Sequence, residues 1–305
     1  MPRNFADRLT AAIAEKDSRI VVGIDPDYQK LPQPLRARAE SMNLPGTAGE
    51  LWAINEFCTR IIEATADSAC AFKPQIAFFE RYGGHGLLVL EKLLRKYRDH
   101  IWIVDCKRGD MGNTSNAYAA AYFSKEDAPP APLDCDAVTH NPYLGYDTIE
   151  PYMPFLQADR GMFLLVKTSN PSSVDFQDLL VGDLPLAEQV AMKVDKWGED
   201  CIGESGYSSL GMVVGATYPE AARVIRRIAP RCYILVPGLE TQGGQVGDAS
   251  CFTNSDGGGA IFNFSRAIIY AYQAPGSPYG WENYAEAARA AAQRYRDGLN
   301  QAIRP

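Results

Sequence analysis

The chain has 305 residues, of which 46% are hydrophobic and 22% charged, and its formal net charge is −7 at pH 7. This composition is that of an ordinary globular protein, and the acidic charge argues against broad nucleic-acid binding, which needs a basic surface. No apolar run is long enough for a membrane span, and the mixed charges and helical periodicity of residues 1–18 argue against a signal peptide. An anionic ligand would therefore have to be held by a local site.

The seven cysteines are scattered along the chain, and no two of them have C-x-x-C spacing. Several lie within apolar runs, which predicts reduced, mostly buried thiols in a cytoplasmic protein. The three histidines, His85, His100 and His140, are not spaced with cysteines or carboxylates as zinc ligands would be. We therefore expect no metal site.

The first predicted element is a helix with Asn4 as its cap and Phe5, Leu9 and Ile13 on one face, which we expect to close the bottom of a barrel. Segment Tyr28–Gly49, rich in Pro, Arg and Gln, is predicted to be a loop or insertion. Eight apolar runs predict strands, at Arg19–Asp25, Ala69–Ala77, Ile101–Val104, Ala137–Asn141, Met162–Ser169, Leu210–Thr217, Cys232–Pro237 and Ala260–Phe264. Between and after them we expect helices at Glu50–Asp67, Leu87–Tyr97, Thr114–Phe123, Leu186–Trp197, Tyr218–Ile228 and Glu282–Ile303, and one through Ile149 and Phe155.

Continuous Val, Ile, Leu and Phe runs are typical of parallel strands that are buried on both faces. Eight such strands alternating with helices in a chain of this length predict an α/β fold, a single-domain (β/α)8 TIM barrel over residues 1–305 with an N-terminal capping helix. A doubly wound open sheet is the alternative. It is disfavoured because no glycine-rich dinucleotide fingerprint follows the first strand.

A cluster of charges ends the third strand, in the stretch IWIVDCKRGDMGNT at Ile101–Thr114. Side chains alternate along a strand, so Asp105 and Lys107 should point the same way, with Asp110 following in the loop. Lys73 lies within another apolar strand, AFKPQIAFF, where a lone ammonium would carry a large desolvation cost. We therefore predict an alternating network of Lys73, Asp105, Lys107 and Asp110.

In a TIM barrel the active site lies at the carboxyl ends of the strands. The polar residues expected there are Asp25, Lys73, Asp105, Lys107, His140, Asn141, Lys167, Thr168, Ser169, Gln242 and Arg266, with Pro237-Gly238 and Ser265 beside them. The glycine-rich segment Gly238–Gly259 could offer backbone amides to an anion, and Arg266 could pair with phosphate oxygens. These features favour a phosphate-bearing ligand.

The spacing D-x-K-x-x-D-x-x-x-T, formed by Asp105, Lys107, Asp110 and Thr114, resembles the signature of the orotidine 5'-phosphate decarboxylase family. The resemblance extends from VVGIDPD to FSRAI and includes FKPQ, THNPYLGYD, VKTSNPSS and VPGLETQGG. The long connections are similar to the longer bacterial branch of that family. Two departures are Met111, where the family usually has Ile, and Ser265, where many members have Gly.

The resemblance implies cofactor-free decarboxylation of orotidine 5'-phosphate to UMP in pyrimidine biosynthesis. Lys107 would donate a proton to C6 of the pyrimidine, and Asp105 and Asp110 would hold Lys107 in place. Lys73 and Asp25 would contact the ribose, and Ser169 the pyrimidine edge. The phosphate would bind to Gln242 and Arg266, and the remaining implied substrate-binding residues are Pro237, Ser265 and Thr114. Asp110 and Thr114 would reach into a neighbouring subunit's site, which implies a homodimer.

Two other interpretations remain. Related barrel enzymes that act on sugar phosphates share the D-x-K-x-x-D spacing, but they place a glutamate on the second strand as a ligand of Mg²⁺. The present chain has Lys73 there, and its ammonium would repel the cation. The second alternative is a barrel that binds phosphate without catalysis, which is disfavoured because all four members of the predicted charge network are present.

Overall fold

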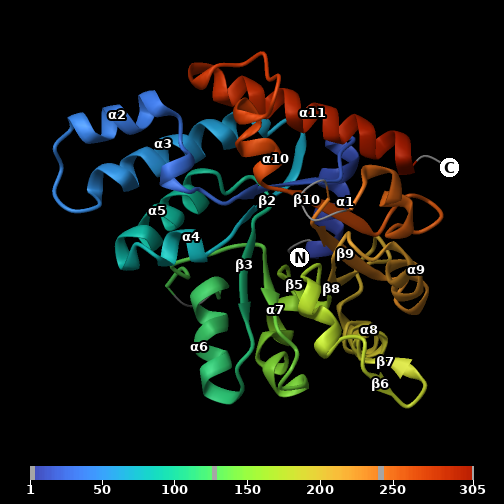
Figure 1. Ribbon diagram of the computed structural model, residues 1–305. Coiled ribbons are helices and arrows are strands. Elements are labelled where there is room, and N and C mark those ends of the chain that lie inside the picture. Colours follow the sequence, from blue (N-terminus) through green and yellow to red (C-terminus); the bar gives the residue numbers. More distant parts are fainter. Residues whose placement is uncertain (1–3, 126–128, 240–243, 304–305) are drawn as a thin grey trace.

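The apolar runs predicted as strands fold into a ring of eight parallel strands with helices around it (Figure 1). The computed structural model describes residues 4–125, 129–239 and 244–303. The strands of the ring, in chain order, are β1 (Ile20–Ile24), β2 (Ala69–Pro74), β3 (Ile103–Arg108), β4 (Ala137–His140), β5 (Gly161–Lys167), β8 (Ser208–Val214), β9 (Cys232–Pro237) and β10 (Ala260–Phe264). Around the ring their order is β2-β1-β10-β9-β8-β5-β4-β3.

The ring closes between β2 and β3. Parallel bridges join Phe72 to Trp102 and Gln75 to Asp105, and the backbone N–H of Phe72 donates to the carbonyl of Ile101 at 2.8 Å. The fold is therefore the predicted (β/α)8 barrel, and the alternative of an open sheet is excluded.

The helices cover the outside of the barrel and close one of its ends. They are α1 (Phe5–Lys16), α2 (Gln33–Ser41), α3 (Ala48–Thr65), α4 (Ala77–Glu80), α5 (Gly83–Lys96), α6 (Gly112–Tyr122), α7 (Met153–Leu156), α8 (Leu186–Trp197), α9 (Pro219–Ile228), α10 (Arg266–Ile269) and α11 (Tyr284–Ile303). A short antiparallel hairpin of β6 (Leu180–Val181) and β7 (Leu184–Pro185) lies before α8. Within the described residues, none of the helices has the length and apolar character needed to cross a membrane.

Helix α1 closes the amino-terminal end of the barrel, as the sequence predicts. The side chain of Asn4 caps the helix by accepting from the N–H of Ala6. Phe5 is buried and packs edge-to-face on Phe163 inside the barrel, with ring centroids 6.1 Å apart. Gly161 makes room for this ring, because a Cβ on that residue would lie 2.3 Å from it. The bottom of the barrel is thus filled with side chains, and a ligand has access from the opposite end.

Three sequence predictions are wrong in detail. Segment Tyr28–Gly49 contains helix α2, which begins with a proline in its first turn, a position where the missing N–H costs nothing. The helix expected through Ile149 and Phe155 is divided into two 3-10 turns and the short α7. Strand β3 runs from Ile103 to Arg108 instead of Ile101 to Val104, so Asp105 and Lys107 lie within it, while Asp110 follows it as expected.

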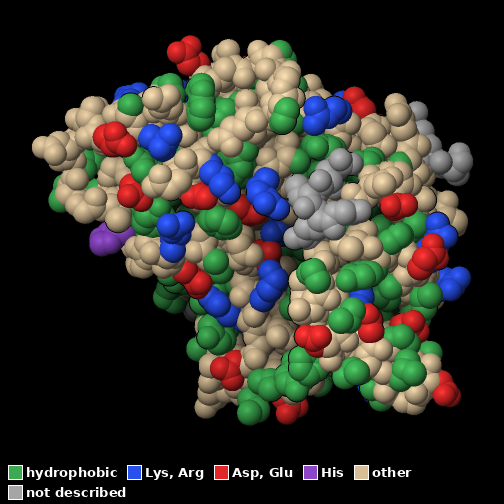
Figure 2. Space-filling view, in the orientation of Figure 1, with side chains coloured by type: hydrophobic (Ala, Val, Ile, Leu, Met, Phe, Trp, Pro, Cys, Tyr) green, Lys and Arg blue, Asp and Glu red, His purple; other side chains and the backbone are tan. Residues whose placement is uncertain are grey.

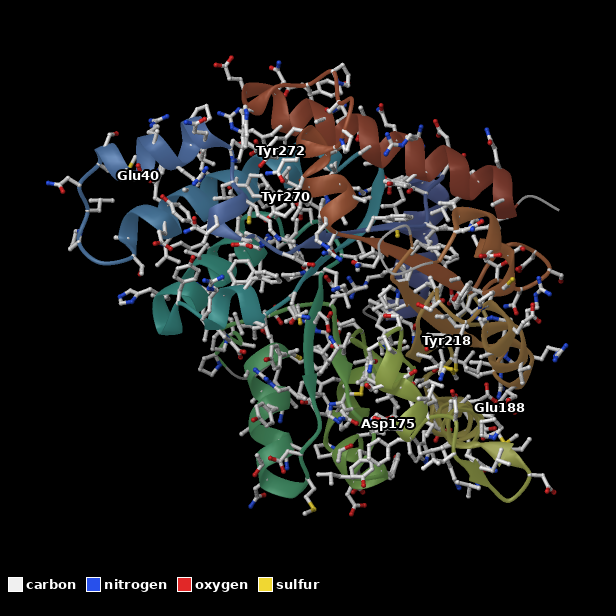
Figure 3. The ribbon with its side chains drawn as sticks, in the orientation of Figure 1. Glu40, Asp175, Glu188, Tyr218, Tyr270 and Tyr272 are labelled. Atoms are coloured by element: carbon white, nitrogen blue, oxygen red, sulfur yellow. The ribbon has the colours of Figure 1, made fainter. Side chains whose placement is uncertain are left out.

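Two tyrosines after α10 hold the segment that follows β1. The hydroxyl of Tyr270 accepts from the N–H of Asp27 at 2.7 Å and donates to the carbonyl of Asp25 at 3.3 Å. Tyr272 donates to the carbonyl of Lys30, and Figure 3 shows the two rings close together beside this segment. These contacts fix the backbone of Asp25 at the end of β1.

Candidate active site

A cavity of about 530 Å³ lies at the carboxyl ends of the barrel strands. Apart from Gln177, which lies further along the chain after β5, its polar lining comes from six of the eight strands or from the residues that directly follow them. It consists of Asp25, Lys73, Gln75, Asp105, Lys107, Thr139, Thr168, Ser169, Asn170, Gln177, Asn263, Ser265 and Arg266. Figure 2 shows basic and acidic side chains gathered around a hollow near the middle of this face. Most of the residues predicted for the site therefore meet in one place.

Asp105 is the centre of the charged cluster. Its Oδ2 accepts from Lys73 Nζ at 2.8 Å and from Gln75 Nε2 at 3.1 Å. Its Oδ1 accepts from Lys107 Nζ at 2.6 Å and from Thr139 Oγ1 at 2.7 Å. Four donors on two oxygens leave this carboxylate almost no freedom to rotate, so it fixes both ammonium groups in the cavity.

The charges of this cluster stabilise one another. Burial alone would lower the pKa of Lys73, but the carboxylates of Asp105 and Asp25 outweigh that effect and raise the pKa above its ordinary value. Burial alone would raise the pKa of Asp105, but Lys73 and Lys107 hold it well below its usual range. At neutral pH the cluster consequently contains a fixed carboxylate between two ammonium groups.

Lys107 has an unusual backbone conformation. Its φ is +46°, in the left-handed region that residues with a side chain rarely adopt. The pairing between β3 and β4 shifts register at this point, and the N–H of Lys107 donates to Thr139 Oγ1 at 3.0 Å. This turn of the backbone carries the Lys107 side chain, which is 46% exposed, to the cavity.

Two acceptors that line the cavity have no hydrogen-bond partner within the part of the chain that the structure describes. They are the buried Oδ1 of Asp25 and the buried Oδ1 of Asn263. Burial raises the pKa of Asp25, and this effect is opposed by Lys73 and Ser265. Buried acceptors without partners are costly, so they point to a ligand that brings hydroxyl or amide donors.

Ser265 fits against β1 because the facing residue is a glycine. A Cβ on Gly23 would lie 1.8 Å from Ser265 Oγ and 2.7 Å from Ser265 Cβ. Asn263 Nδ2 donates to the same hydroxyl at 3.2 Å. The serine that departs from the family pattern is thus accommodated by the missing side chain of Gly23.

We predict that Gly23→Ala lowers the free energy of unfolding by roughly 1–3 kcal/mol, the usual cost of overpacking a filled site. It should also weaken binding of UMP, the product that the family resemblance implies, because Ser265 and Arg266 would be displaced from the cavity wall. Changing Ser265 to Gly removes the clashing atoms, so Gly23→Ala/Ser265→Gly should recover most of both losses. Urea denaturation and calorimetric titration of the three variants measure the two effects, and a Gly23→Ala protein indistinguishable from wild type would contradict the prediction.

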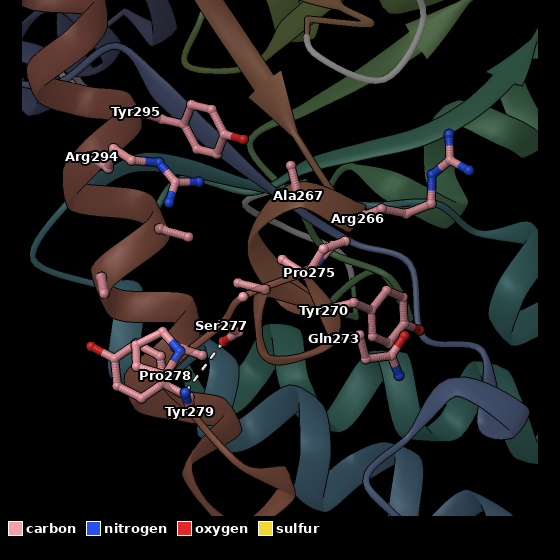
Figure 4. Close-up of a pocket in the computed structure, with 16 residues that line it drawn as sticks. Arg266, Ala267, Tyr270, Gln273, Pro275, Ser277, Pro278, Tyr279, Arg294 and Tyr295 are labelled. Atoms are coloured by element: carbon pink, nitrogen blue, oxygen red, sulfur yellow. Dashed lines mark hydrogen bonds between the residues drawn. The ribbon is translucent and has the colours of Figure 1, made fainter.

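Five of the seven predicted substrate-binding residues line the cavity, namely Asp25, Ser169, Pro237, Ser265 and Arg266. Arg266 begins α10 and also borders a second cavity of about 620 Å³ between the segment after β10 and α11. Figure 4 shows its guanidinium turned away from Arg294 and Tyr295 of that second cavity. The cation therefore lies on the barrel side, where a phosphate could reach it.

Other predicted residues lie elsewhere. Asp110 and Thr114 are outside the cavity lining, and Asp110 Oδ1 accepts from the N–H of Met111 at 2.8 Å. Asp110 makes no ion pair with Lys107 in the described residues, so the single chain joins three of the four members of the predicted network. Gln242 lies outside the residues that the structure describes.

Among the residues of the glycine-rich segment Gly238–Gly259 that the structure describes, only those at the beginning border the cavity, which corrects the prediction for the second half of the segment. Gly238 lines the cavity, whereas Gly259 directly precedes β10 at the amino-terminal end of the barrel. There its carbonyl accepts from the buried Arg226 at 2.7 Å. The long loop thus returns the chain to the bottom of the barrel.

The alternation of side chains along each strand decides which strand-end residues reach the cavity. On β4, Thr139 points inward, while His140 points outward, is fully buried and packs on Tyr152 with ring centroids 5.3 Å apart. Burial lowers the pKa of His140 to about 4. Lys167 on β5 likewise lies outside the cavity lining, where it pairs with Asp178 at 2.6 Å.

Sequence reasoning missed five polar cavity residues, Gln75, Thr139, Asn170, Gln177 and Asn263. Gln75 could have been found because it directly follows Lys73-Pro74 at the end of β2. Gln177 carries no comparable signal, since it lies ten residues after the end of β5. No group of three or more His, Cys, Asp or Glu side chains suited to a metal ion occurs over residues 4–125, 129–239 and 244–303.

An eight-stranded parallel barrel with a charged cavity at the carboxyl ends of its strands defines a TIM-barrel enzyme. Comparison with known proteins identifies the enzyme family. Residues 18–276 match the model of the Orotidine 5'-phosphate decarboxylase / HUMPS family. The chain belongs to this family.

Curated relatives and solved structures agree with this assignment. The orotidine 5'-phosphate decarboxylase of Caldicellulosiruptor bescii is 40% identical over 98% of this chain and 99% of its own length. That of Roseiflexus castenholzii is 38% identical over 99% of both chains. A crystal structure of a putative orotidine-monophosphate decarboxylase from Toxoplasma gondii is 34% identical, with a TM-score of 0.78 over 98% of this chain and 99% of that one. The chain is therefore a carboxy-lyase of the same kind as these relatives.

Proposed function

We propose that this enzyme converts orotidine 5'-phosphate to UMP and carbon dioxide without a metal or organic cofactor, as a step of pyrimidine biosynthesis. The observation that carries the proposal is the fixed Lys73–Asp105–Lys107 cluster inside the cavity, with distances of 2.8 and 2.6 Å between its charged atoms. A lysine on β2, where the sugar-phosphate enzymes need a metal ligand, further favours the decarboxylase.

Lys107 is the group that supplies the proton. When the bond between C6 and the carboxylate breaks, its electron pair stays on C6, and the Lys107 ammonium stabilises this developing carbanion. The proton then moves from Nζ to C6, giving UMP and a neutral lysine that regains a proton from water. Asp105 holds Nζ at 2.6 Å, so the ammonium needs little reorganisation during the reaction.

The remainder of the cavity suits the other parts of the substrate. The buried Oδ1 atoms of Asp25 and Asn263 can accept from ribose hydroxyls, and Lys73 can donate to them. Arg266 provides a cation for the phosphate, with Gln242 as a second proposed contact. Ser169 is assigned to the pyrimidine edge, and Pro237 and Ser265 complete the wall. Contacts remote from C6 can supply binding energy for positioning the reacting group.

The test is the ultraviolet absorbance change of orotidine 5'-phosphate with the purified chain, measured with and without EDTA. We expect equal conversion to UMP in both. Absence of conversion by folded protein would refute the proposed activity, and loss of conversion in EDTA would refute the metal-free mechanism. A sugar-phosphate assay with Mg²⁺ would then be the next measurement.

We also propose a homodimer in which Asp110 and Thr114 complete the site of the partner subunit. Asp110 lies outside the cavity of its own chain, and beside it Met111 is 57% exposed, while Tyr143 in the loop after β4 is 79% exposed. Exposed apolar side chains of this kind are typical of interaction surfaces. Sedimentation equilibrium should give twice the chain mass of 33.5 kDa, and a monomer that is fully active would contradict the shared site.

Residues 1–305 are further proposed to act as one domain in the cytoplasm. All seven cysteines are buried free thiols, which supports a reducing compartment. A single cooperative unfolding transition and recovery of the chain in the cytoplasmic fraction of cells are the corresponding tests.

A further inference from the structure

We propose that Lys167 is a positioning residue that holds segment 168–178 as the cavity wall against which the pyrimidine base binds. This inference rests on the proposed function. It concerns a buried cation that takes no part in the Lys73–Asp105–Lys107 cluster, and it assigns this cation an effect on substrate recognition.

Lys167 is enclosed by groups from the segment that follows β5 and from the start of α9. Its side chain is 2% exposed, and Nζ lies 2.6 Å from Asp178 Oδ1 and 3.2 Å from Ser173 Oγ. The same ammonium lies 4.3 Å from the centre of the Tyr218 ring. Ser173 belongs to the 3-10 turn Pro171–Asp175, and Figure 3 shows Tyr218 above this turn. Through its contacts with Ser173 and Tyr218, Lys167 therefore connects the turn both to the barrel and to α9.

Stability alone does not account for this arrangement. Replacing a buried ion pair with well-packed apolar residues is often neutral or stabilising, because both charges must be desolvated. An ion pair combined with a hydrogen bond and a cation–π contact does, however, specify one geometry for the segment that carries Asp178 and Ser173. We therefore look for the consequence of Lys167 in what that geometry places.

The segment held by Lys167 forms part of the active-site wall. Gln177, the residue before Asp178, accepts from the N–H of Thr168 at 2.8 Å and donates to Thr168 Oγ1 at 2.8 Å. Thr168 and Gln177 line the cavity together with Ser169 and Asn170. The ion pair at Asp178 thus fixes the backbone next to Gln177, and Gln177 in turn fixes the backbone next to Ser169.

The position of this wall indicates which part of the substrate it meets. In the ring of eight strands β5 lies opposite β1, which ends at Asp25, whereas Arg266 follows β10 beside β1. With the phosphate at Arg266, the ribose at Asp25 and C6 at Lys107, the polar edge of the base remains to face the wall after β5. Loss of the Lys167 contacts should accordingly weaken recognition of the base more than recognition of the ribose phosphate.

The experiment compares two ligands and two lysines. Lys167→Met should raise the Kd for UMP about tenfold, the effect of a small misplacement of a positioning element, and leave the Kd for ribose 5-phosphate within about twofold of wild type. The KM for orotidine 5'-phosphate should rise with the Kd for UMP, with a smaller change in kcat. Lys16→Met is the matched control, because Lys16 Nζ also bonds inside the protein, to the carbonyls of Ala66 and Ala69, but at the other end of the barrel. It should lower Tm and change neither Kd.

Asp178→Asn provides a second variant in case Lys167→Met does not fold, because the Asp178 side chain is 46% exposed and its replacement perturbs the core less. Like Lys167→Met, it should raise the Kd for UMP and leave the Kd for ribose 5-phosphate close to that of wild type. Equal weakening of both ligands, or no change in either, by a folded variant would overturn the positioning role. A failure of the proposed function would instead appear in the wild-type chain, which would then neither convert orotidine 5'-phosphate nor bind UMP.

Discussion

Replacing Lys107 with alanine is expected to abolish decarboxylation while the chain stays folded. The variant loses the proton donor, and general acid catalysis contributes about 10²–10⁴ in rate. It also loses a fixed charge at the developing carbanion, and removal of one such group typically lowers kcat by about 10²–10³-fold. We therefore expect kcat to fall by at least ~10⁴-fold. Absorbance assays at high enzyme concentration, with circular dichroism to verify folding, measure the loss.

The control for this variant is Lys96→Ala. The Lys96 side chain is 54% exposed and pairs with Glu63 at 3.4 Å, so it matches the exposure of Lys107 at a distance from the cavity, and its loss should leave kcat unchanged. A further comparison, between Lys107→Gly and Lys107→Ala, tests the strain in the backbone at this residue. Because φ of Lys107 is +46°, Lys107→Gly should be more stable than Lys107→Ala by about 1 kcal/mol. Substantial turnover by folded Lys107→Ala would remove this lysine from the proposed role.

The charge cluster could be predicted from the sequence because its cost is visible there. A lysine within an apolar strand requires a carboxylate, and Asp105 on the neighbouring strand is the partner found at 2.8 Å. The capping role of α1 was equally accessible, since one face of the helix is apolar and must be buried. Both predictions depend only on local pattern and on the neighbour relations of a barrel.

Features that depend on register and on shape could not be predicted. Residues Thr139 and His140 are adjacent, and only the pairing of β4 with its neighbours decides that the threonine faces the cavity. Lys167 stands at a strand end like Lys107 but points outward to Asp178, which lies eleven residues further along the chain. The fit of Ser265 against Gly23 joins residues that are far apart in sequence and becomes visible only when both strands are placed.

Asp105→Asn is expected to remove activity and also to destabilise the fold. The side chain is 11% exposed, and an amide would turn its NH₂ group toward one of the two lysines or toward Thr139 or Gln75. Lys73, 4% exposed, would then be a buried cation without its main partner. Breaking a buried pair in this way typically costs about 3–5 kcal/mol. We expect a loss of about 3 kcal/mol in the free energy of unfolding, because Asp25 still offsets part of the charge.

Asp136→Asn is the control that separates the loss of activity from the loss of stability expected for Asp105→Asn. Asp136 is similarly buried, with a side chain 12% exposed, and accepts from Arg8 at 2.6 Å and from the N–H of Trp102 at 2.8 Å at the amino-terminal end of the barrel. It should lose stability to a comparable degree and keep its kcat. Equal activities in the two folded variants would show that Asp105 is a structural carboxylate only.

The pH dependence of stability gives an independent check on Asp105. Although burial opposes it, Lys73 and Lys107 hold the pKa of this carboxyl below its usual range, so the folded chain binds fewer protons here than the unfolded chain. The contribution to stability is then complete above the unfolded pKa of about 4 and is lost as the pH falls below that value. In urea denaturation, the difference between wild type and Asp105→Asn should be constant from about pH 5 to 8 and should shrink below about pH 4. A difference that grows toward acid pH would mean that the carboxyl is protonated in the folded enzyme, and the fixed charge that positions Lys107 would be absent.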